Sequence, residues 1–147
     1  MRRLEQLLGV TLLLFTACKS YDSINIDNNV PEIIFEINKR GCYGSCPIYN
    51  ITLYSDLKVK YSGEKFIENI GQFEWSISKE DFQNITDIIV KTFNQSKSYN
   101  TYVQDLPLTT LKIWKEIKIE FKGACPKEFK KEFLEIEQKI LKNSKWK

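Results

Sequence analysis

Short runs in which apolar and polar residues alternate dominate the chain from residue 32 onward. In one of them Phe73, Trp75 and Ile77 alternate with polar residues, and this period of two is typical of a half-buried β-strand. Comparable runs lie before and after it. The strands predicted are 32–37, 48–54, 58–62, 72–77, 111–113 and 117–121.

Two further segments repeat their apolar residues with the spacing of a helix. The first begins at Ser78, where Asp81 completes a capping-box arrangement. The second has Pro126 in its first turn, a position that suits proline. Between them, 95–107 is predicted to be a polar loop that ends in Asp105-Leu106-Pro107. The apolar faces are Phe82, Ile85, Ile88, Ile89 and Phe93 in the first helix, and Phe129, Phe133, Ile136 and Ile140 in the second.

Strands and helices therefore follow the order ββββ-α-ββ-α. Because successive strands are joined by connections of hairpin length, we predict an α+β fold with a largely antiparallel sheet and the helices packed on one face. Residues 32–147 suffice for a single domain of this kind. The predicted core is Ile51, Leu53, Val59, Phe73, Trp75, Phe82, Ile85, Ile89, Ile113, Ile119, Phe121, Phe133, Ile136 and Ile140.

Composition narrows the chemistry that this domain can perform. None of the 147 residues is histidine, which excludes Ser-His-Asp and Cys-His hydrolases and zinc sites built on histidine. Lysines and acidic residues alternate instead of clustering and the net charge is +3, so no nucleic-acid partner is predicted. We predict no catalytic residues, bound metal or cofactor, although the cysteines and some carboxylates leave alternatives open.

The start of the chain resembles a bacterial lipoprotein signal. A short cationic beginning precedes the apolar stretch 7–15, which is too short to span a bilayer but has signal-peptide length. The stretch ends at Phe15-Thr16-Ala17-Cys18, which resembles the lipobox, whose cysteine is acylated and becomes the new N-terminus. The resemblance implies a signal peptide at 1–17, lipid on Cys18, a polar tether at 18–31 and a membrane-anchored place in the bacterial cell envelope. The alternative is an ordinary cleaved signal in which the cysteine stands by chance.

The loop between the first two predicted strands carries the motif Gly41-Cys42-Tyr43-Gly44-Ser45-Cys46-Pro47. In an extended chain its two cysteines would lie about 13 Å apart, so a disulfide requires the loop to fold back, and Gly44 is the residue best able to permit that. Three interpretations compete: a disulfide that holds a turn, a redox pair and a metal site. The C-x3-C spacing differs from that of thioredoxin, and a strand follows instead of a helix. A resemblance to the copper site of Sco-type assembly proteins lacks the histidine that those proteins need. Cys125 can pair with either cysteine or stay reduced.

The motif and the order of elements together resemble a family of small lipoproteins and secreted proteins of Bacteroidota that carry a domain of unknown function. The family pattern C-x-G-x-C-P-x-Y is matched by Cys42, Gly44, Cys46, Pro47 and Tyr49, and its D-L-P segment by Asp105, Leu106 and Pro107. The resemblance spans roughly residues 33–141 and implies a Cys42–Cys46 pairing, but no activity. Leu57 departs from the pattern because the family usually has glycine there, and Cys125 is additional.

We expect a non-enzymatic envelope module, held on the membrane by its lipid, that binds an envelope protein or a glycan. Binding would use an exposed sheet face or the loops around Cys42 and Asp105. The residues predicted to take part are Tyr43, Tyr49 and Asp105.

Two alternatives come from other functional classes. The first is a thiol-disulfide or metal-handling protein that uses Cys42 and Cys46. The second is an enzyme built on carboxylates such as Asp105 and Glu74, although no spacing in the sequence pairs them.

Overall fold

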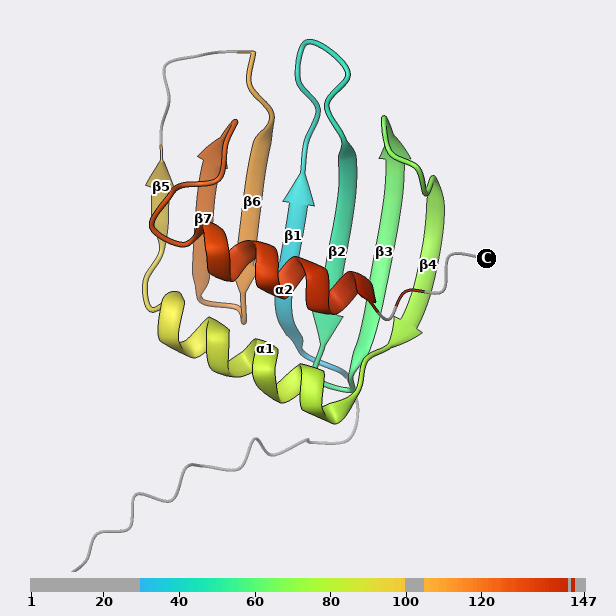
Figure 1. Cartoon of the computed structure of the whole chain (residues 1–147), viewed down its shortest axis with the longest axis vertical. Helices are drawn as coiled ribbons and strands as arrows, with labels where there is room; N and C mark the ends of the chain where they lie inside the picture. The colour runs from blue at the N-terminus through green and yellow to red at the C-terminus, as the bar shows by residue number, and fades with distance from the viewer. Residues whose placement is uncertain (1–29, 100–104, 143, 145–147) are drawn as a thin grey trace, which may run out of the picture.

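The computed structural model describes residues 30–99, 105–142 and 144, which form a seven-stranded sheet with two helices on one of its faces (Figure 1). The predicted α+β fold, its largely antiparallel sheet and its packing of helices on one face are confirmed. The strands are β1 (Ile33–Lys39), β2 (Ile48–Tyr54), β3 (Lys58–Lys65), β4 (Gly71–Ser76), β5 (Lys97–Tyr99), β6 (Leu108–Ile113) and β7 (Ile117–Lys122), and the helices are α1 (Lys79–Thr92) and α2 (Lys130–Lys142).

Two sets of hairpins build the sheet. Strands β1 to β4 form an antiparallel meander, β6 and β7 form a second hairpin, and β6 pairs with the free side of β1. The resulting order is β4-β3-β2-β1-β6-β7-β5, with β1 in the middle. Helix α1 carries the chain from the β4 edge to the β5 edge, and α2 runs back across the same face (Figure 1).

Strand β5 corrects the prediction that 95–107 is a polar loop throughout. Its three residues pair in parallel with β7, from Lys97 opposite Ile119 to Tyr99 opposite Phe121. The Ser96 hydroxyl supports this pairing because it accepts a hydrogen bond from the Lys118 backbone N–H at 3.0 Å. A strand this short has no alternation of its own to detect, and it forms because β7 offers an unpaired edge.

The central strand β1 supplies core residues that the alternation did not predict. Ile34 is 2% exposed, and Phe35 and Ile37 are fully buried. Strands pair with β1 on both sides, and its register with β2 shifts between Ile33 and Phe35. This irregularity lets the neighbouring residues Ile34 and Phe35 both be buried, which a strictly alternating pattern does not predict.

The predicted registers of the other strands are confirmed. Trp75 is 9% exposed and Phe121 is 3% exposed. Phe73 and Phe82 are only half-buried, because Phe73 lies on the edge strand β4 and Phe82 in the first turns of α1. The remaining predicted core residues are buried: Ile51, Leu53, Val59, Ile85, Ile89, Ile113, Ile119, Phe133, Ile136 and Ile140.

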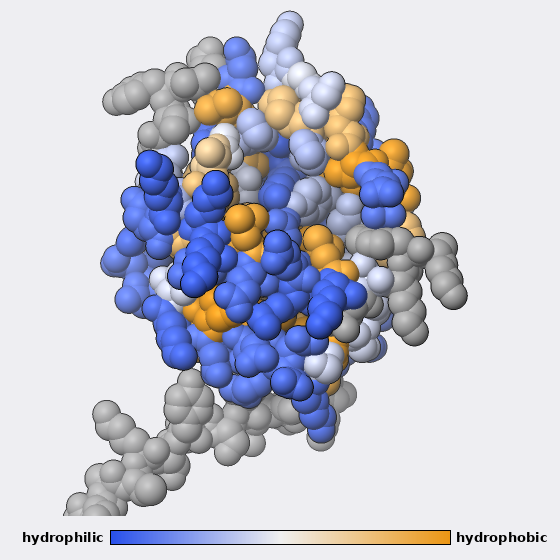
Figure 2. Space-filling view, in the orientation of Figure 1, coloured by the Kyte–Doolittle hydropathy of each residue, from blue (hydrophilic) through white to orange (hydrophobic). Residues whose placement is uncertain are grey.

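The two helices begin differently. Ser78 caps α1 as predicted: its Oγ accepts a hydrogen bond from the Asp81 backbone N–H at 3.0 Å and donates one to the Asp81 carboxylate at 2.9 Å. Helix α2 begins at Lys130, so the prediction that Pro126 stands in its first turn is wrong. The Pro126 carbonyl instead accepts a hydrogen bond from the Phe129 N–H at 3.4 Å, which closes a separate turn ahead of the helix. Seen from the helix side, the surface over α1 and α2 is mainly hydrophilic (Figure 2).

Leu57, the residue that stands where the resembled family usually has glycine, adopts a left-handed backbone conformation with φ of 69°. It ends the turn between β2 and β3. Its N–H donates to the Tyr54 carbonyl at 3.1 Å, and its carbonyl accepts from the Ile77 N–H at 3.0 Å. The side chain packs against the core, so leucine combines favourable burial with a backbone cost of about 1–2 kcal/mol.

An alanine variant is usually more stable than a glycine variant at the same position, and we predict the reverse at Leu57. Both Leu57→Ala and Leu57→Gly lose the packing of the leucine side chain, but only glycine removes the backbone cost. The free energy of unfolding, measured by urea titration, should therefore be about 1 kcal/mol higher for Leu57→Gly than for Leu57→Ala. Leu57→Ala being the more stable variant would contradict this account of the turn.

Candidate functional site

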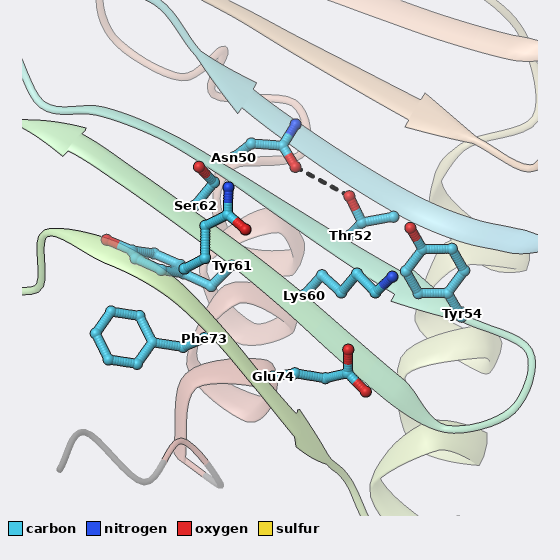
Figure 3. Close-up of a pocket in the computed structure, with 9 residues that line it drawn as sticks. Asn50, Thr52, Tyr54, Lys60, Tyr61, Ser62, Phe73 and Glu74 are labelled. Carbon is cyan, nitrogen blue, oxygen red and sulfur yellow. Dashed lines mark hydrogen bonds between the residues drawn. The ribbon is translucent and has the colours of Figure 1, made fainter.

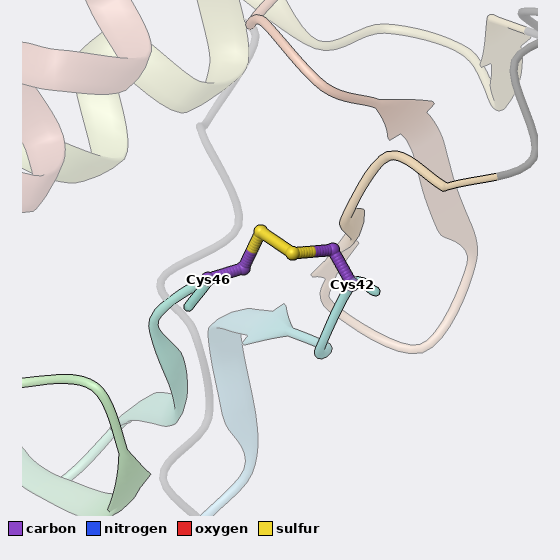
Figure 4. Close-up of a disulfide and its surroundings, with 2 residues drawn as sticks. All are labelled: Cys42 and Cys46. Carbon is purple, nitrogen blue, oxygen red and sulfur yellow. A yellow bond between two sulfur atoms is a disulfide. The ribbon is translucent and has the colours of Figure 1, made fainter. Parts of the chain in front are cut away.

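The loop at 41–47 joins β1 to β2 and projects beyond the ends of the neighbouring strands (Figure 1). Within it the sulfur atoms of Cys42 and Cys46 lie at bonding distance, 1.94 Å, and the two Cα atoms are 5.6 Å apart (Figure 4). This is the pairing that the family resemblance implied. Tyr43, beside the disulfide, is 94% exposed.

This loop folds back without using the conformational freedom of glycine. Gly44 lies outside the left-handed region, and a Cβ added to it would meet the Cys42 sulfur at 3.8 Å, an ordinary contact. The expectation that Gly44 permits the reversal is therefore wrong. The chain turns through successive bends at 43–45 instead.

The segment Asp105-Leu106-Pro107 lies at the same end of the sheet. The Arg40 N–H donates to the Leu108 carbonyl at 2.9 Å, which joins the start of the disulfide loop to the start of β6. Gly123 donates its N–H to the proline carbonyl at 2.9 Å and has φ of 73°. A Cβ on Gly123 would come within 2.8 Å of Leu106, so the glycine packs closely against this leucine. Leu106 and Pro107 therefore both contact Gly123 and hold the start of β6 next to the end of β7. Asp105 itself is exposed.

Tyr49 points the other way, toward α2. Its hydroxyl donates a hydrogen bond to Glu137 Oε1, and Lys39 Nζ lies 3.0 Å from the same oxygen. The ammonium also lies 4.7 Å from the centre of the Tyr49 ring. Side-chain exposure is 12% for Glu137 and 25% for Lys39. The network thus joins β1, β2 and α2 through one half-buried carboxylate.

This environment determines the protonation of Tyr49. Burial, followed by the neighbouring Glu137 carboxylate, raises the pKa of the phenol well above its usual value. At neutral pH the hydroxyl is therefore a hydrogen-bond donor and not a base. The three predicted binding residues do not converge, because Tyr43 and Asp105 are exposed while the Tyr49 hydroxyl bonds to α2.

Cys125 remains a free thiol and is half-buried. Burial is the main cause that raises its pKa to about 11. The thiol is consequently protonated at neutral pH, and a protonated thiol is a poor nucleophile.

The sheet face opposite the helices presents polar side chains in register across five strands. One row contains only uncharged amides and hydroxyls: Thr110 on β6, Asn38 on β1, Asn50 on β2, Ser62 on β3 and Gln72 on β4. The next row consists of Lys112, Glu36, Thr52, Lys60 and Glu74 on the same strands. Figure 3 shows the part of this face that lies on β2, β3 and β4.

Two of the charged side chains in the second row form an ion pair with each other, and a third lies near an aromatic ring. Lys112 Nζ lies 3.0 Å from Glu36 Oε1, and Lys60 Nζ lies 5.4 Å from the centre of the Tyr54 ring. In the uncharged row, Asn50 Oδ1 accepts a hydrogen bond from the Thr52 hydroxyl at 2.9 Å (Figure 3).

At least three hollows in the described part of the chain are lined in part by residues of these rows. The first, of about 430 Å³, is lined by side chains of both rows on β2, β3 and β4. The second, of about 350 Å³, adjoins the disulfide loop and shares Asn50 with the first. The third, of about 790 Å³, lies toward the start of β1; Trp114 and Ile117 line it, and it shares Tyr54 with the first.

Sequence reasoning predicted an exposed sheet face as one possible binding surface, but not these aligned rows on it. Each strand shows polar residues at alternate positions, which is also the pattern of a merely solvated face. The alignment of Thr110 with Asn38 depends on the pairing of β6 with β1, two strands far apart in the sequence. Only the β1–β4 part of the row follows from hairpin connections.

The described part of the chain contains no group of three or more histidine, cysteine, aspartate or glutamate residues placed to hold a metal ion. Neither of its helices is long and apolar enough to cross a bilayer. The predicted signal peptide, Cys18 and most of the tether lie outside the described residues.

The fold and this geometry define an α+β protein with one open sheet face and a disulfide-closed loop at one end. Residues 33–143 match a domain of unknown function, DUF6438, and the chain belongs to this family. Comparisons with curated proteins and with solved structures give no match.

We predict that the protein, purified without reductant, contains a Cys42–Cys46 disulfide and a slowly reacting Cys125. Mass spectrometry of the non-reduced protein should detect the Cys42–Cys46 peptide. Alkylation of Cys125 at pH 8 should be slow in the folded protein, because its pKa of about 11 leaves little thiolate, and fast after unfolding. A peptide that joins Cys125 to either partner would refute the pairing.

We also predict that the Lys39–Glu137 pair couples more strongly than an ordinary surface pair. A double-mutant cycle with Lys39→Met and Glu137→Gln should give a coupling energy of about 1–2 kcal/mol in urea unfolding. The pair Lys139 and Glu135 on α2, whose charged atoms lie 4.0 Å apart, is the matched control and should give about 0.3–0.5 kcal/mol. Equal coupling in the two cycles would show that the network does not tie α2 to the sheet.

Proposed function

We propose that this protein is a lipid-anchored module of the bacterial cell envelope that binds another envelope component through the open face of its sheet. The observation that carries the proposal is the uneven use of the two sheet faces. Both helices pack on one face, whereas the opposite face carries aligned polar rows and hollows.

The place where the chain enters the domain supports this arrangement. Val30, the first described residue, is 79% exposed and precedes β1, whereas the disulfide loop follows the other end of that strand. A tether at 18–31 could extend by at most about 3.5 Å per residue, or roughly 45 Å in all. With lipid on Cys18, the domain could stand clear of the bilayer with its sheet face accessible.

The proposal assigns no catalytic role to Tyr49, Cys125 or Glu137. The Tyr49 phenol and the Cys125 thiol both have pKa values raised further above neutral pH by burial. Glu137 is engaged by Lys39 and Tyr49.

The anchoring half of the proposal is tested at Cys18. Replacing Cys18 by Ala should release the protein from the membrane fraction or leave it as unprocessed precursor, and should abolish palmitate incorporation. Cys125→Ala is the matched control and should remain membrane-bound and labelled. Palmitate incorporation that survives Cys18→Ala would exclude the assignment.

The binding half is tested with a chain that starts at Lys19 and therefore lacks the anchor. This protein should sediment with envelopes prepared from cells that lack it. Ser62→Lys, on the open face, should reduce the sedimented fraction at least tenfold, whereas Gln138→Lys, exposed on α2, should leave it unchanged. Equal retention of both variants would exclude the open face as the binding surface.

A further inference from the structure

The uncharged row is the most regular polar feature of the open face, because its residues lie in register on neighbouring strands. Because neighbouring strands lie about 4.8 Å apart, the row from β6 to β4 is roughly 19 Å long. Its side chains offer both hydrogen-bond donors and acceptors, since each amide carries an NH₂ group and a carbonyl oxygen. The side chains of Asn38, Ser62 and Gln72 have no hydrogen-bond partner within the described part of the chain.

Charge argues against a polyionic ligand. Between β6 and β4 the first row has no charged residue, although its next position, on β7, is Glu120. The second row contains two lysines, Lys112 and Lys60, and two glutamates, Glu36 and Glu74. Lys118, next to these rows on β7, lies 2.9 Å from Glu120 Oε1. Neither a polyanion nor a polycation would find a complementary surface here, because a ligand of either sign would meet both attraction and repulsion.

Apolar contact is available at one border of the rows. The Tyr54 ring lines both the 430 Å³ and the 790 Å³ hollows, and Lys60 lies against it. An aromatic ring beside uncharged donors and acceptors suits a ligand whose units carry hydroxyl groups at their edges and C–H groups on their faces.

We propose that the uncharged row binds a neutral polysaccharide that lies across the strands from Asn38 to Gln72, since Thr110 is only 5% exposed and its hydroxyl already donates to Glu120. Successive sugar units would meet successive strands, with their hydroxyl groups bonded to Asn38, Asn50, Ser62 and Gln72. This inference rests on the proposed function and names the class of envelope component that the open face binds.

The experiment uses the mature protein purified in detergent and measures binding by calorimetry. The probes are neutral hexasaccharides of β-linked glucose, N-acetylglucosamine, mannose and xylose, with the matching disaccharides and with heparin as an anionic comparison. At least one neutral hexasaccharide should bind with a submillimolar Kd, and its disaccharide at least tenfold more weakly because it spans fewer strands. Binding should not weaken as salt is raised.

Two variants locate the site. Ser62→Ala and Gln72→Ala should each weaken hexasaccharide binding about tenfold, which corresponds to roughly 1.4 kcal/mol. Gln138→Ala on α2 is the matched control for Gln72→Ala and should bind like the unmodified protein. Because Gln72 and Gln138 are both exposed, neither substitution should affect folding.

Three outcomes would overturn the inference: no neutral hexasaccharide binds, heparin binds in preference with strong salt dependence, or Ser62→Ala with Gln72→Ala together leave binding intact. Its failure is separable from that of the proposed function. If envelope sedimentation depends on Ser62 but no neutral probe binds, the open face binds some other component and only the inference fails. If sedimentation is also insensitive to Ser62→Lys, both fail.

Discussion

The pairing of β1 with strands on both sides is the constraint on which the rest of the structure depends. Phe35 and Ile37 are fully buried beneath the helices, and their positions fix the registers of β2 and β6. Because side chains alternate along a strand, a slip of one residue would exchange the two faces of the sheet. The same registers that place Ile51 and Leu111 in the core place Asn50 and Thr110 on the open face. Burial on one side thereby orders the polar side chains on the other.

The residues of the family motif stabilise one end of this sheet. Its cysteines close the loop between β1 and β2, and its tyrosine, Tyr49, reaches α2 through Glu137. The D-L-P segment joins the start of β6 to the end of β7 through the contacts of its leucine and proline with Gly123. These residues are distinctive in the sequence, yet most of their contacts are structural. The face proposed for binding contains none of them.

Prediction from the sequence succeeded where one local pattern determined the structure. The alternation around Trp75 and the cap at Ser78 each specify one element, and both are as predicted. It was wrong at β5, which forms because the edge of β7, a strand later in the sequence, is beside it. It was also wrong at the start of α2, where a local turn closed by the Pro126 carbonyl precedes the helix. Gly44 shows a third limit, since a glycine that looks necessary for a turn lies outside the left-handed region. The aligned row could not be predicted from the sequence for the same reason as β5: it depends on the pairing of β6 with β1, two strands far apart in the sequence.

The pairing of the strands would assist the binding that we propose for the open face. Side chains held on paired strands need little ordering when a ligand arrives, so less of each contact's energy is lost to entropy. A single amide or hydroxyl contact with an exposed ligand contributes little, on the order of 1 kcal/mol. Several such contacts at a fixed spacing add up only for a ligand that repeats its own groups along its length. A row of similar side chains in register therefore favours an extended, repetitive partner over a small molecule bound in one hollow.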